Sequence, residues 1–76
     1  MKLSELRKSR GDTQEQLAAD MSTTQGQVSR IERQKDLKLS TIQRYVSALG
    51  GRLEVIVTFP GAVIYHIDIE TKETSD

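Results

Sequence analysis

The stretch TQEQLAADMSTTQGQVSRIERQ, residues 13–34, contains two short amphipathic segments joined by a small polar turn. Each segment begins with a threonine and has a glutamine three residues later. In this pairing a hydroxyl and a side-chain amide satisfy the free N–H groups at the start of a helix. Apolar residues then recur at helical spacing, at Leu17, Ala18, Met21, Val28 and Ile31. The stretch therefore predicts two helices that share a buried side.

Helices are also predicted on both sides of this pair. Residues 3–10 form a charged segment with two leucines on one face, and Gly11 can end it. Residues 40–49 begin with Ser40 as a third capping residue, with Gln43 in the partner position. An apolar stripe at helical spacing follows, made of Ile42, Tyr45, Val46 and Leu49. We therefore expect four helices before the glycine pair that comes next.

A change of period marks the C-terminal part. Residues 53–59 and 63–69 alternate apolar with mostly polar side chains, and Pro60-Gly61 favours a turn between them. This pattern predicts a β-hairpin with one apolar face, built from Leu53, Val55, Val57, Phe59, Tyr65, Ile67 and Ile69. An isolated two-stranded hairpin is marginal in water and leaves unpaired backbone groups along its edges. We therefore expect the hairpin to cover the helices of its own chain and to form a dimer interface by pairing an edge with the hairpin of a second copy.

Composition limits the class of protein. The chain has 76 residues, no cysteine and one histidine, so neither a disulfide framework nor a metal site is expected. No Ser/His/Asp set or glycine-rich phosphate loop is present, so we expect no enzyme activity, catalytic residue or cofactor. The lack of a signal peptide or transmembrane run predicts a cytoplasmic protein. The expected organisation is a mainly α chain with a helical domain at 1–52, a hairpin at 53–70 and a flexible tail at 71–76.

Charge is divided unevenly along the chain, although the formal net charge is zero. Residues 1–52 contain ten Lys or Arg and six Asp or Glu, a balance of +4. Residues 53–76 contain one Lys and five Asp or Glu, a balance of −4. Such an asymmetry indicates a polyanionic partner at the helical end and a different role for the hairpin end.

The inner pair of helices has the spacing of a helix-turn-helix, with the small Ala18 where two steeply crossed helices approach each other. The outer face of the second helix is polar. Such a helix fits the major groove of B-DNA, where glutamine can bond adenine, arginine can bond guanine and a threonine methyl can contact thymine. The candidate base-reading residues are Thr24, Gln25, Gln27, Ser29 and Arg30. For Gln27 a capping role is the alternative.

Further polar residues are candidates for contact with DNA phosphates. Gln14 lies at the start of the preceding helix, where its side chain and free N–H groups can meet a phosphate. Arg33 continues the basic side of the second helix. Arg10 belongs either to a phosphate-binding patch with Arg7 and Lys8 or to an ordinary solvated helix end.

Residues 3–49 resemble the DNA-binding domains of the Cro and phage-repressor family, also called the XRE helix-turn-helix family. The motif residues are Thr13-Gln14, Leu17-Ala18, Thr24-Gln25, Val28-Ser29 and Ile31-Glu32. The resemblance implies that Gln14 contacts a phosphate and that Arg30 faces base edges. It implies that Thr24 and Gln25 open the recognition helix. It also implies that the DNA backbone is held further along by Lys35, Lys38 and the helix start capped by Ser40.

The chain departs from the family pattern at two positions. Ser22 stands in the turn where the family usually has glycine, so we expect a serine with positive φ and a strain of about 1 kcal/mol. Gly26 lies within the recognition helix, where it removes one possible base contact and lowers helix propensity by about 0.8–1 kcal/mol relative to alanine. Neither departure is expected to prevent folding.

The C-terminal part narrows the resemblance. The segment LSTIQRYVSALGGRLEVIVTF, residues 39–59, and the second strand up to Ile69 are similar to the end of HigA-type antitoxins of bacterial type II toxin–antitoxin operons. This resemblance implies a homodimer that binds a palindromic operator, represses its own operon and has a cognate toxin as partner. Because the chain begins at its first helix, either it is a truncated DNA-binding half or toxin contact lies elsewhere. The alternatives are a phage-type or stand-alone repressor, or a protein-interaction module that adds a strand to a partner's sheet.

Overall fold

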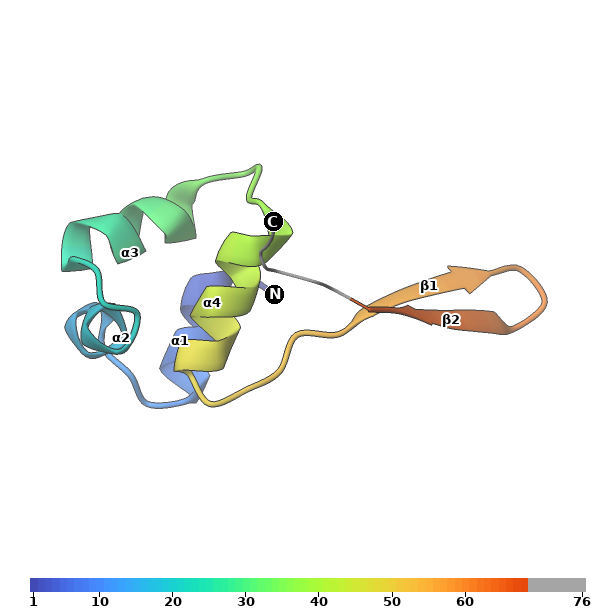
Figure 1. Ribbon diagram of the computed structural model, residues 1–76, viewed down its shortest axis with the longest axis horizontal. Coiled ribbons are helices and arrows are strands. Elements are labelled where there is room, and N and C mark those ends of the chain that lie inside the picture. The colour runs from blue at the N-terminus through green and yellow to red at the C-terminus, as the bar shows by residue number, and fades with distance from the viewer. Residues whose placement is uncertain (69–76) are drawn as a thin grey trace.

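The computed structural model describes residues 1–68, which form four helices followed by a two-stranded antiparallel hairpin (Figure 1). In chain order the elements are α1 Leu3–Ser9, α2 Gln14–Asp20, α3 Gln25–Arg33, α4 Leu39–Ala48, β1 Val55–Phe59 and β2 Val63–Ile67. The predicted mainly α fold with a C-terminal hairpin is confirmed. Ile69, which we placed in the dimer interface, and the predicted tail at 71–76 lie outside the described residues.

The start of α2 has the full capping arrangement that its sequence predicts. The Gln16 N–H donates to Thr13 Oγ1 at 3.0 Å, and the Thr13 N–H donates to Gln16 Oε1 at 2.8 Å. The start of α3 has only half of it, because Thr24 Oγ1 accepts from the Gln27 N–H at 3.2 Å while the Gln27 side chain makes no return bond within residues 1–68. The amide of Gln27 is therefore free of a capping role and is exposed.

The predicted cap at Ser40 is wrong. The chain is extended at Lys38, which is the N-cap of α4, and no side chain caps this helix. The carbonyl of Lys38 accepts hydrogen bonds from the N–H groups of Thr41 at 3.0 Å and Ile42 at 3.1 Å. Because these backbone bonds begin the helix two residues earlier than predicted, Ser40 lies inside the first turn of α4.

A small core lies between α2, α3 and α4. Its buried apolar members are Leu17, Ala18, Met21, Val28 and Tyr45, and the half-buried Leu3, Ile31, Ala48 and Leu49 pack against them. In Figure 1, α2 is seen almost end-on and α3 runs across it. Ala18, with 4% of its surface exposed, is buried as expected for a small residue beneath a crossing helix.

The turn between α2 and α3 depends on a serine in the left-handed region. Ser22 has φ 55°, which confirms the predicted positive φ. The helix end is closed by two bonds, from the Ser22 N–H to the Ala19 carbonyl at 3.1 Å and from the Thr23 N–H to the Ala18 carbonyl at 2.9 Å. These bonds hold the serine where glycine would be unstrained, so the turn keeps its geometry at a cost of about 1 kcal/mol.

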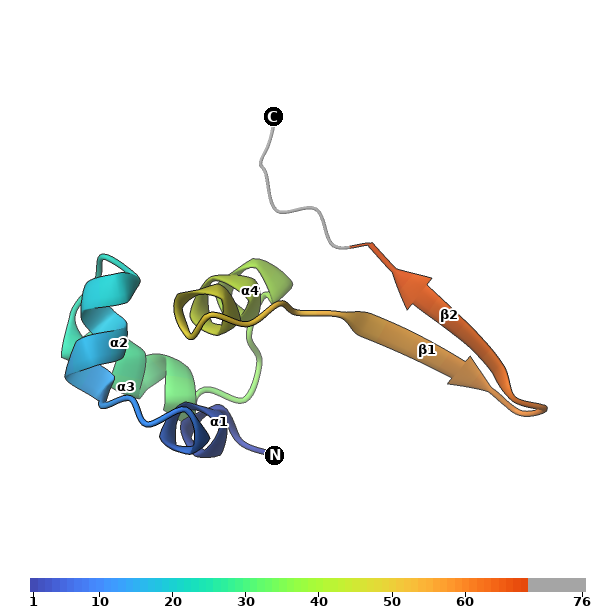
Figure 2. The ribbon, with the colours of Figure 1, turned by 90° about the horizontal axis from the view of Figure 1, so that it is seen from below.

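The hairpin extends away from the helices (Figures 1 and 2). Our prediction that it covers the helices of its own chain is therefore wrong. After α4 ends at Ala48, the segment before β1 continues outward, and neither strand contributes to the core. At the end of β2, His66 and Ile67 line a groove with Gln43 of α4. The separation is possible because the core is already closed by the aromatic ring of Tyr45, which is fully buried.

The hairpin carries an apolar face that is open to solvent. The strand register pairs Val55 with Ile67, Val57 with Tyr65 and Phe59 with Val63. Cross-strand partners point to the same face of a sheet, so these six side chains lie together. The ring centroids of Phe59 and Tyr65 are 5.9 Å apart in an edge-to-face arrangement, and about half of each side chain is exposed. Five of the predicted residues lie on this face, together with Val63, which was not predicted, and Phe59, Val63, Tyr65 and Ile67 are exposed.

Candidate nucleic-acid interface

The outer face of α3 is fixed by the way its inner face is buried. Val28 is fully buried in the core and Ile31 packs against it, so the helix cannot rotate about its axis without losing these contacts. The predicted base-reading residues Thr24, Gln25, Gln27 and Arg30 are exposed, and Ser29 is half-buried. A short helix with a polar, outward face is therefore presented on a rigid support.

The first residues of α2 and α3 are joined by their side chains. Gln25 Nε2 donates to Gln14 Oε1 at 2.5 Å, and Gln14 Nε2 donates to Glu32 Oε1 at 2.9 Å. The structure thus connects a predicted phosphate contact, Gln14, with a predicted base reader, Gln25. The spacing of the sequence gave no sign of this connection, because the two glutamines lie in different helices.

Glu32 is the centre of a buried polar network beneath this face. Arg7 binds its carboxylate through two nitrogens, Nε at 2.7 Å and Nη2 at 3.2 Å, and Arg7 Nη1 donates to the Asp12 carbonyl at 2.8 Å. Tyr45 donates its hydroxyl proton to Glu32 Oε2 at 2.5 Å, with the Leu3 carbonyl at 3.0 Å as a second acceptor. The network joins α1, α3 and α4 beneath the outer face of α3.

Each ionisable group of this network has a shifted pKa. Burial alone raises the pKa of Glu32, but the hydrogen bonds from Arg7, Tyr45 and Gln14 outweigh this effect and lower it below its ordinary value. The hydrogen bond to Glu32 raises the pKa of Arg7, and burial followed by the bond to Glu32 raises the pKa of Tyr45. Glu32 and Arg7 are therefore both charged at neutral pH.

Arg7 is therefore a core residue. Only 7% of its surface is exposed, and its guanidinium is occupied by Glu32 and the Asp12 carbonyl. The phosphate-patch interpretation does not hold for this arginine. No local spacing could have identified its partner, because Arg7 and Glu32 are 25 residues apart and in different helices.

An open groove runs beside the outer face of α3 between the starts of α1 and α2. It has a volume of about 610 Å³ and is lined by Lys2, Ser4, Gln14, Ser29, Glu32, Arg33, Gln34 and Lys35. Four of the predicted site residues are thus brought together here, namely Gln14, Ser29, Arg33 and Lys35. Lys2, Ser4 and Gln34 were not predicted, because the sequence does not show that α1 begins beside the end of α3.

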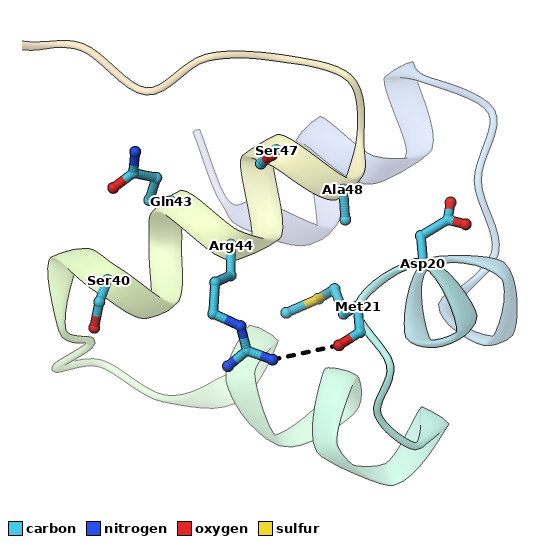
Figure 3. Close-up of a pocket in the computed structure, with 7 residues that line it drawn as sticks. All are labelled: Asp20, Met21, Ser40, Gln43, Arg44, Ser47 and Ala48. Atoms are coloured by element: carbon cyan, nitrogen blue, oxygen red, sulfur yellow. Dashed lines mark hydrogen bonds between the residues drawn. The ribbon is translucent and has the colours of Figure 1, made fainter. Parts of the chain in front are cut away.

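Three predicted phosphate contacts lie elsewhere. Arg10 is the exposed C-cap of α1, and Lys38 is the exposed N-cap of α4. Ser40 belongs to a different groove of about 410 Å³, between α2 and α4, where Arg44 Nη2 donates to the Met21 carbonyl at 3.3 Å (Figure 3). The two grooves have no lining residue in common, so the structure does not bring Ser40 together with Gln14.

A family model described as "Helix-turn-helix" matches residues 3–56, which is most of the chain. The chain belongs to the helix-turn-helix family. The match includes all four helices, the turn at Ser22 and the start of β1. Every described helix of this helix-turn-helix protein is too short or too polar to cross a bilayer.

Two solved structures resemble this helix-turn-helix protein over nearly their whole lengths. One is described as "DNA bound antitoxin HigA3"; it has 32% sequence identity and a TM-score of 0.84, with 96% of each chain covered. The other is described as "Induced DNA bending by unique dimerization of HigA antitoxin"; it has 35% identity and a TM-score of 0.82, with 90% of this chain and 92% of that chain covered. No curated protein sequence matches the chain.

Gly26 gives a test of the recognition helix that leaves the polar face in place. A Cβ atom added at this position would have only Thr24 Oγ1 near it, at 4.0 Å, so Gly26→Ala fits without strain. We expect the variant to be more stable by about 0.5 kcal/mol, because glycine loses more backbone entropy than alanine when a helix forms. Urea unfolding of both proteins at one protomer concentration measures the difference. A less stable variant would show that α3 does not start at Gln25.

Proposed function

We propose that this protein is a dimeric, sequence-specific DNA-binding repressor that acts as the antitoxin of a toxin–antitoxin operon. The observation that carries the proposal is the exposed polar face of α3, supported from below by Val28 and by the Glu32 network. The likeness to DNA-bound HigA antitoxins, at 32% and 35% identity over at least 90% of each chain, supports the same function. A DNA-binding regulator needs no catalytic group, and its operator places it in the bacterial cytoplasm.

Base reading is assigned to the residues at the start and middle of α3. Gln25 can form paired bonds with adenine, and Arg30 can form them with guanine. Thr24 can offer its methyl group to thymine, and the amide of Gln27 is available because it does not cap the helix. Ser29 lies at the wall of the groove beside α3, where its hydroxyl can reach the edge of a base or an oxygen of the DNA backbone.

Phosphate binding is assigned to the groove beside α3. Arg33 and Lys35 supply the charge from one wall and Lys2 from the other, while Gln14 supplies an amide. Contacts of this type set the position of a protein on the duplex and give binding its dependence on salt. A DNA backbone that extends past this groove would meet further hydrogen-bond donors. These are Lys38 and Ser40 at the start of α4 and Arg10 at the end of α1.

The hairpin is the proposed dimer interface. Its apolar face is exposed, and a face of this kind in water is normally covered by a partner. Two helix-turn-helix units related by a dyad read two half-sites about one helical turn apart, which requires a palindromic operator. The domain at 1–52, which carries the basic charge, then binds DNA, and the hairpin at 53–70, which carries acidic charge, forms the dimer interface.

Arg30→Ala tests the assignment of base reading. The arginine is exposed and its side chain makes no hydrogen bond within residues 1–68, so we expect its replacement to leave the fold intact. We expect a loss of about 1–3 kcal/mol on the DNA upstream of the gene and little change on random DNA. Fluorescence titration at fixed salt measures both affinities.

The matched control is Arg52→Ala, which removes the same charge from an exposed residue of the segment before β1. It should leave the ratio of specific to random binding unchanged. An equal loss on both DNAs for Arg30→Ala would make this arginine a phosphate contact. Co-purification of the protein with the product of a neighbouring gene separates the antitoxin from a stand-alone repressor, for which no such partner is expected.

A further inference from the structure

The side of the hairpin opposite the apolar face also carries exposed apolar residues. Ile56 pairs with His66 and Thr58 pairs with Ile64, so these four side chains lie together on that side. The exposed fractions are 52% for Ile56 and 59% for Ile64, close to those of the two aromatic side chains on the apolar face. The hairpin therefore has two surfaces that a partner can cover, and a dimer formed through the apolar face uses only one of them.

Two carboxylates lie at the base of this side. Oε1 of Glu54 is 3.9 Å from Nε2 of His66. Both residues line an open groove beside α4, about 450 Å³ in volume, together with Asp68. Oε2 of Glu54 accepts a hydrogen bond from Arg52 at 2.8 Å, whereas Oε1 faces the groove without a bond from residues 1–68. We call this set the second face of the hairpin, and all of its members are exposed: Glu54, Ile56, Thr58, Ile64, His66 and Asp68.

The charge of the second face indicates which kind of partner fits it. Residues 53–76 carry a balance of −4, so the hairpin of another copy would bring like charge to this face, and DNA would also be repelled. The basic helices of the same chain do not cover it, because the hairpin extends away from them (Figure 2), and their charge is assigned to DNA in the proposed function. A different protein that presents lysine or arginine beside apolar side chains complements both the carboxylates and the isoleucines.

We propose that the second face of the hairpin is the docking site of the toxin, whose apolar side chains cover Ile56 and Ile64 and whose lysine or arginine pairs with Glu54 and Asp68. The inference rests on the proposed function, since it requires that the protein is an antitoxin. The toxin and the second copy then bind opposite sides of the same two strands and do not compete. The outer face of α3 stays free for DNA, since the hairpin lies away from it (Figure 1).

The double variant Ile56→Thr, Ile64→Thr tests the apolar part of the docking site. Threonine keeps the branched Cβ that strands favour, and both positions are exposed, so we expect the hairpin to stay folded. The probe is the purified product of the neighbouring gene, titrated against each protein. We expect binding to be at least about tenfold weaker in the variant. Sedimentation and operator titration should show an unchanged dimer and unchanged DNA affinity.

The matched control is Leu39→Thr. Leu39 is 51% exposed at the start of α4, so the change removes a similar exposed apolar side chain from a surface outside the hairpin. It should leave the affinity for the probe unchanged.

The double variant Glu54→Gln, Asp68→Asn tests the charged part. It removes two negative charges and keeps the shapes of the side chains. For the unmodified protein we expect the affinity for the probe to fall as salt is added, because salt screens the pairing of exposed charges. This fall should be clearly smaller in the variant. Glu15→Gln, Asp20→Asn removes the same charge from two exposed residues of α2 and should keep the salt dependence of the unmodified protein.

The outcomes separate this inference from the proposed function. If the unmodified protein does not bind the product of the neighbouring gene, the antitoxin function and the inference fail together. If it binds and the isoleucine variant binds as tightly, or if this variant loses the dimer, only the inference is overturned. If the isoleucine variant does not fold, the charge variant decides, and an unchanged salt dependence in that variant overturns the inference.

Discussion

Arg7→Met is expected to lower the free energy of unfolding by about 3–5 kcal/mol, the cost of leaving a buried charge without its partner. The Glu32 side chain is 5% exposed and receives two of its four hydrogen bonds from Arg7. Methionine fills a similar volume but gives no hydrogen bond and no charge. A domain of this size has a total stability of roughly 4–11 kcal/mol, so the variant should be partly unfolded at room temperature. Urea unfolding at one protomer concentration provides the measurement.

The double variant Arg7→Met, Glu32→Leu is the control. Replacing both members of a buried ion pair by apolar residues of similar volume is often neutral or stabilising, so most of the loss should be recovered. The recovery is incomplete because Tyr45 and Gln14 lose their acceptor in this variant. A loss below about 1 kcal/mol in the single variant would show that the pair is solvated and that the network does not organise the core.

The effect of pH on the stability contributed by Glu32 should have opposite signs in the unmodified protein and in Arg7→Met. In the unmodified protein the pKa of Glu32 is below its ordinary value of 4.5, so the stability it contributes is complete above pH 4.5 and is lost as pH falls through the folded-state pKa. In Arg7→Met the hydrogen bonds from Arg7 to Glu32 are absent, so we expect burial to raise the pKa of Glu32. The folded variant then binds a proton more readily than the unfolded chain, so its deficit should shrink as pH falls towards 4.5. Unfolding at pH 7 and pH 5 shows the change.

Val57→Asp is expected to weaken dimerisation by at least about 100-fold, which corresponds to about 2.8 kcal/mol. Val57 lies in the middle of β1, opposite Tyr65, on the apolar face of the hairpin. A carboxylate at this point would be buried without a partner in the dimer but solvated in the monomer, so it destabilises only the dimer. Sedimentation over a range of protein concentrations measures the dissociation constant. Operator affinity should fall with it, because two half-sites are then read by separate molecules.

Thr58→Asp is the matched control for this prediction. Thr58 is the next residue of the same strand, is exposed, and points to the opposite face together with its partner Ile64. The change adds the same charge and leaves the apolar face intact, so dimerisation should change little. An equal loss in both variants would indicate an effect of charge or of strand stability. A monomeric unmodified protein at the concentrations that bind operator would contradict the dimer itself.

The helical core and the turn could be predicted from the sequence because each depends on neighbours in the chain. The Thr13 cap needs Gln16, three residues away, and the buried set of α2 and α3 follows from helical spacing. The positive φ at Ser22 follows from its place directly after a helix end. The outer face of α3 follows in turn, since burial of Val28 determines which side chains point outward.

The two errors have different causes, one local and one that depends on distant parts of the chain. Ser40 fits a capping pattern, but backbone bonds to the Lys38 carbonyl start the helix earlier. The alternation of apolar and polar side chains along the strands predicted an apolar face on the hairpin. This pattern does not determine which other surface that face packs against. In the structure the hairpin extends away from the helices, whose core already contains the fully buried Tyr45 (Figure 2).

The sequence by itself determined the four helices, the strained turn, the hairpin and the residues of its apolar face, because local hydrogen bonding and the period of apolar side chains specify them. Only the tertiary structure decided that Arg7 and Glu32, 25 residues apart, form a buried pair and that Gln14 links this pair to Gln25. The physical reason is that a buried charge is tolerated only with a partner that donates from the right direction, and that partner is chosen by helix packing. Periodicity identifies Gln25 as an outward residue, but only the packing of α2 against α3 brings Gln14 close enough to bond it.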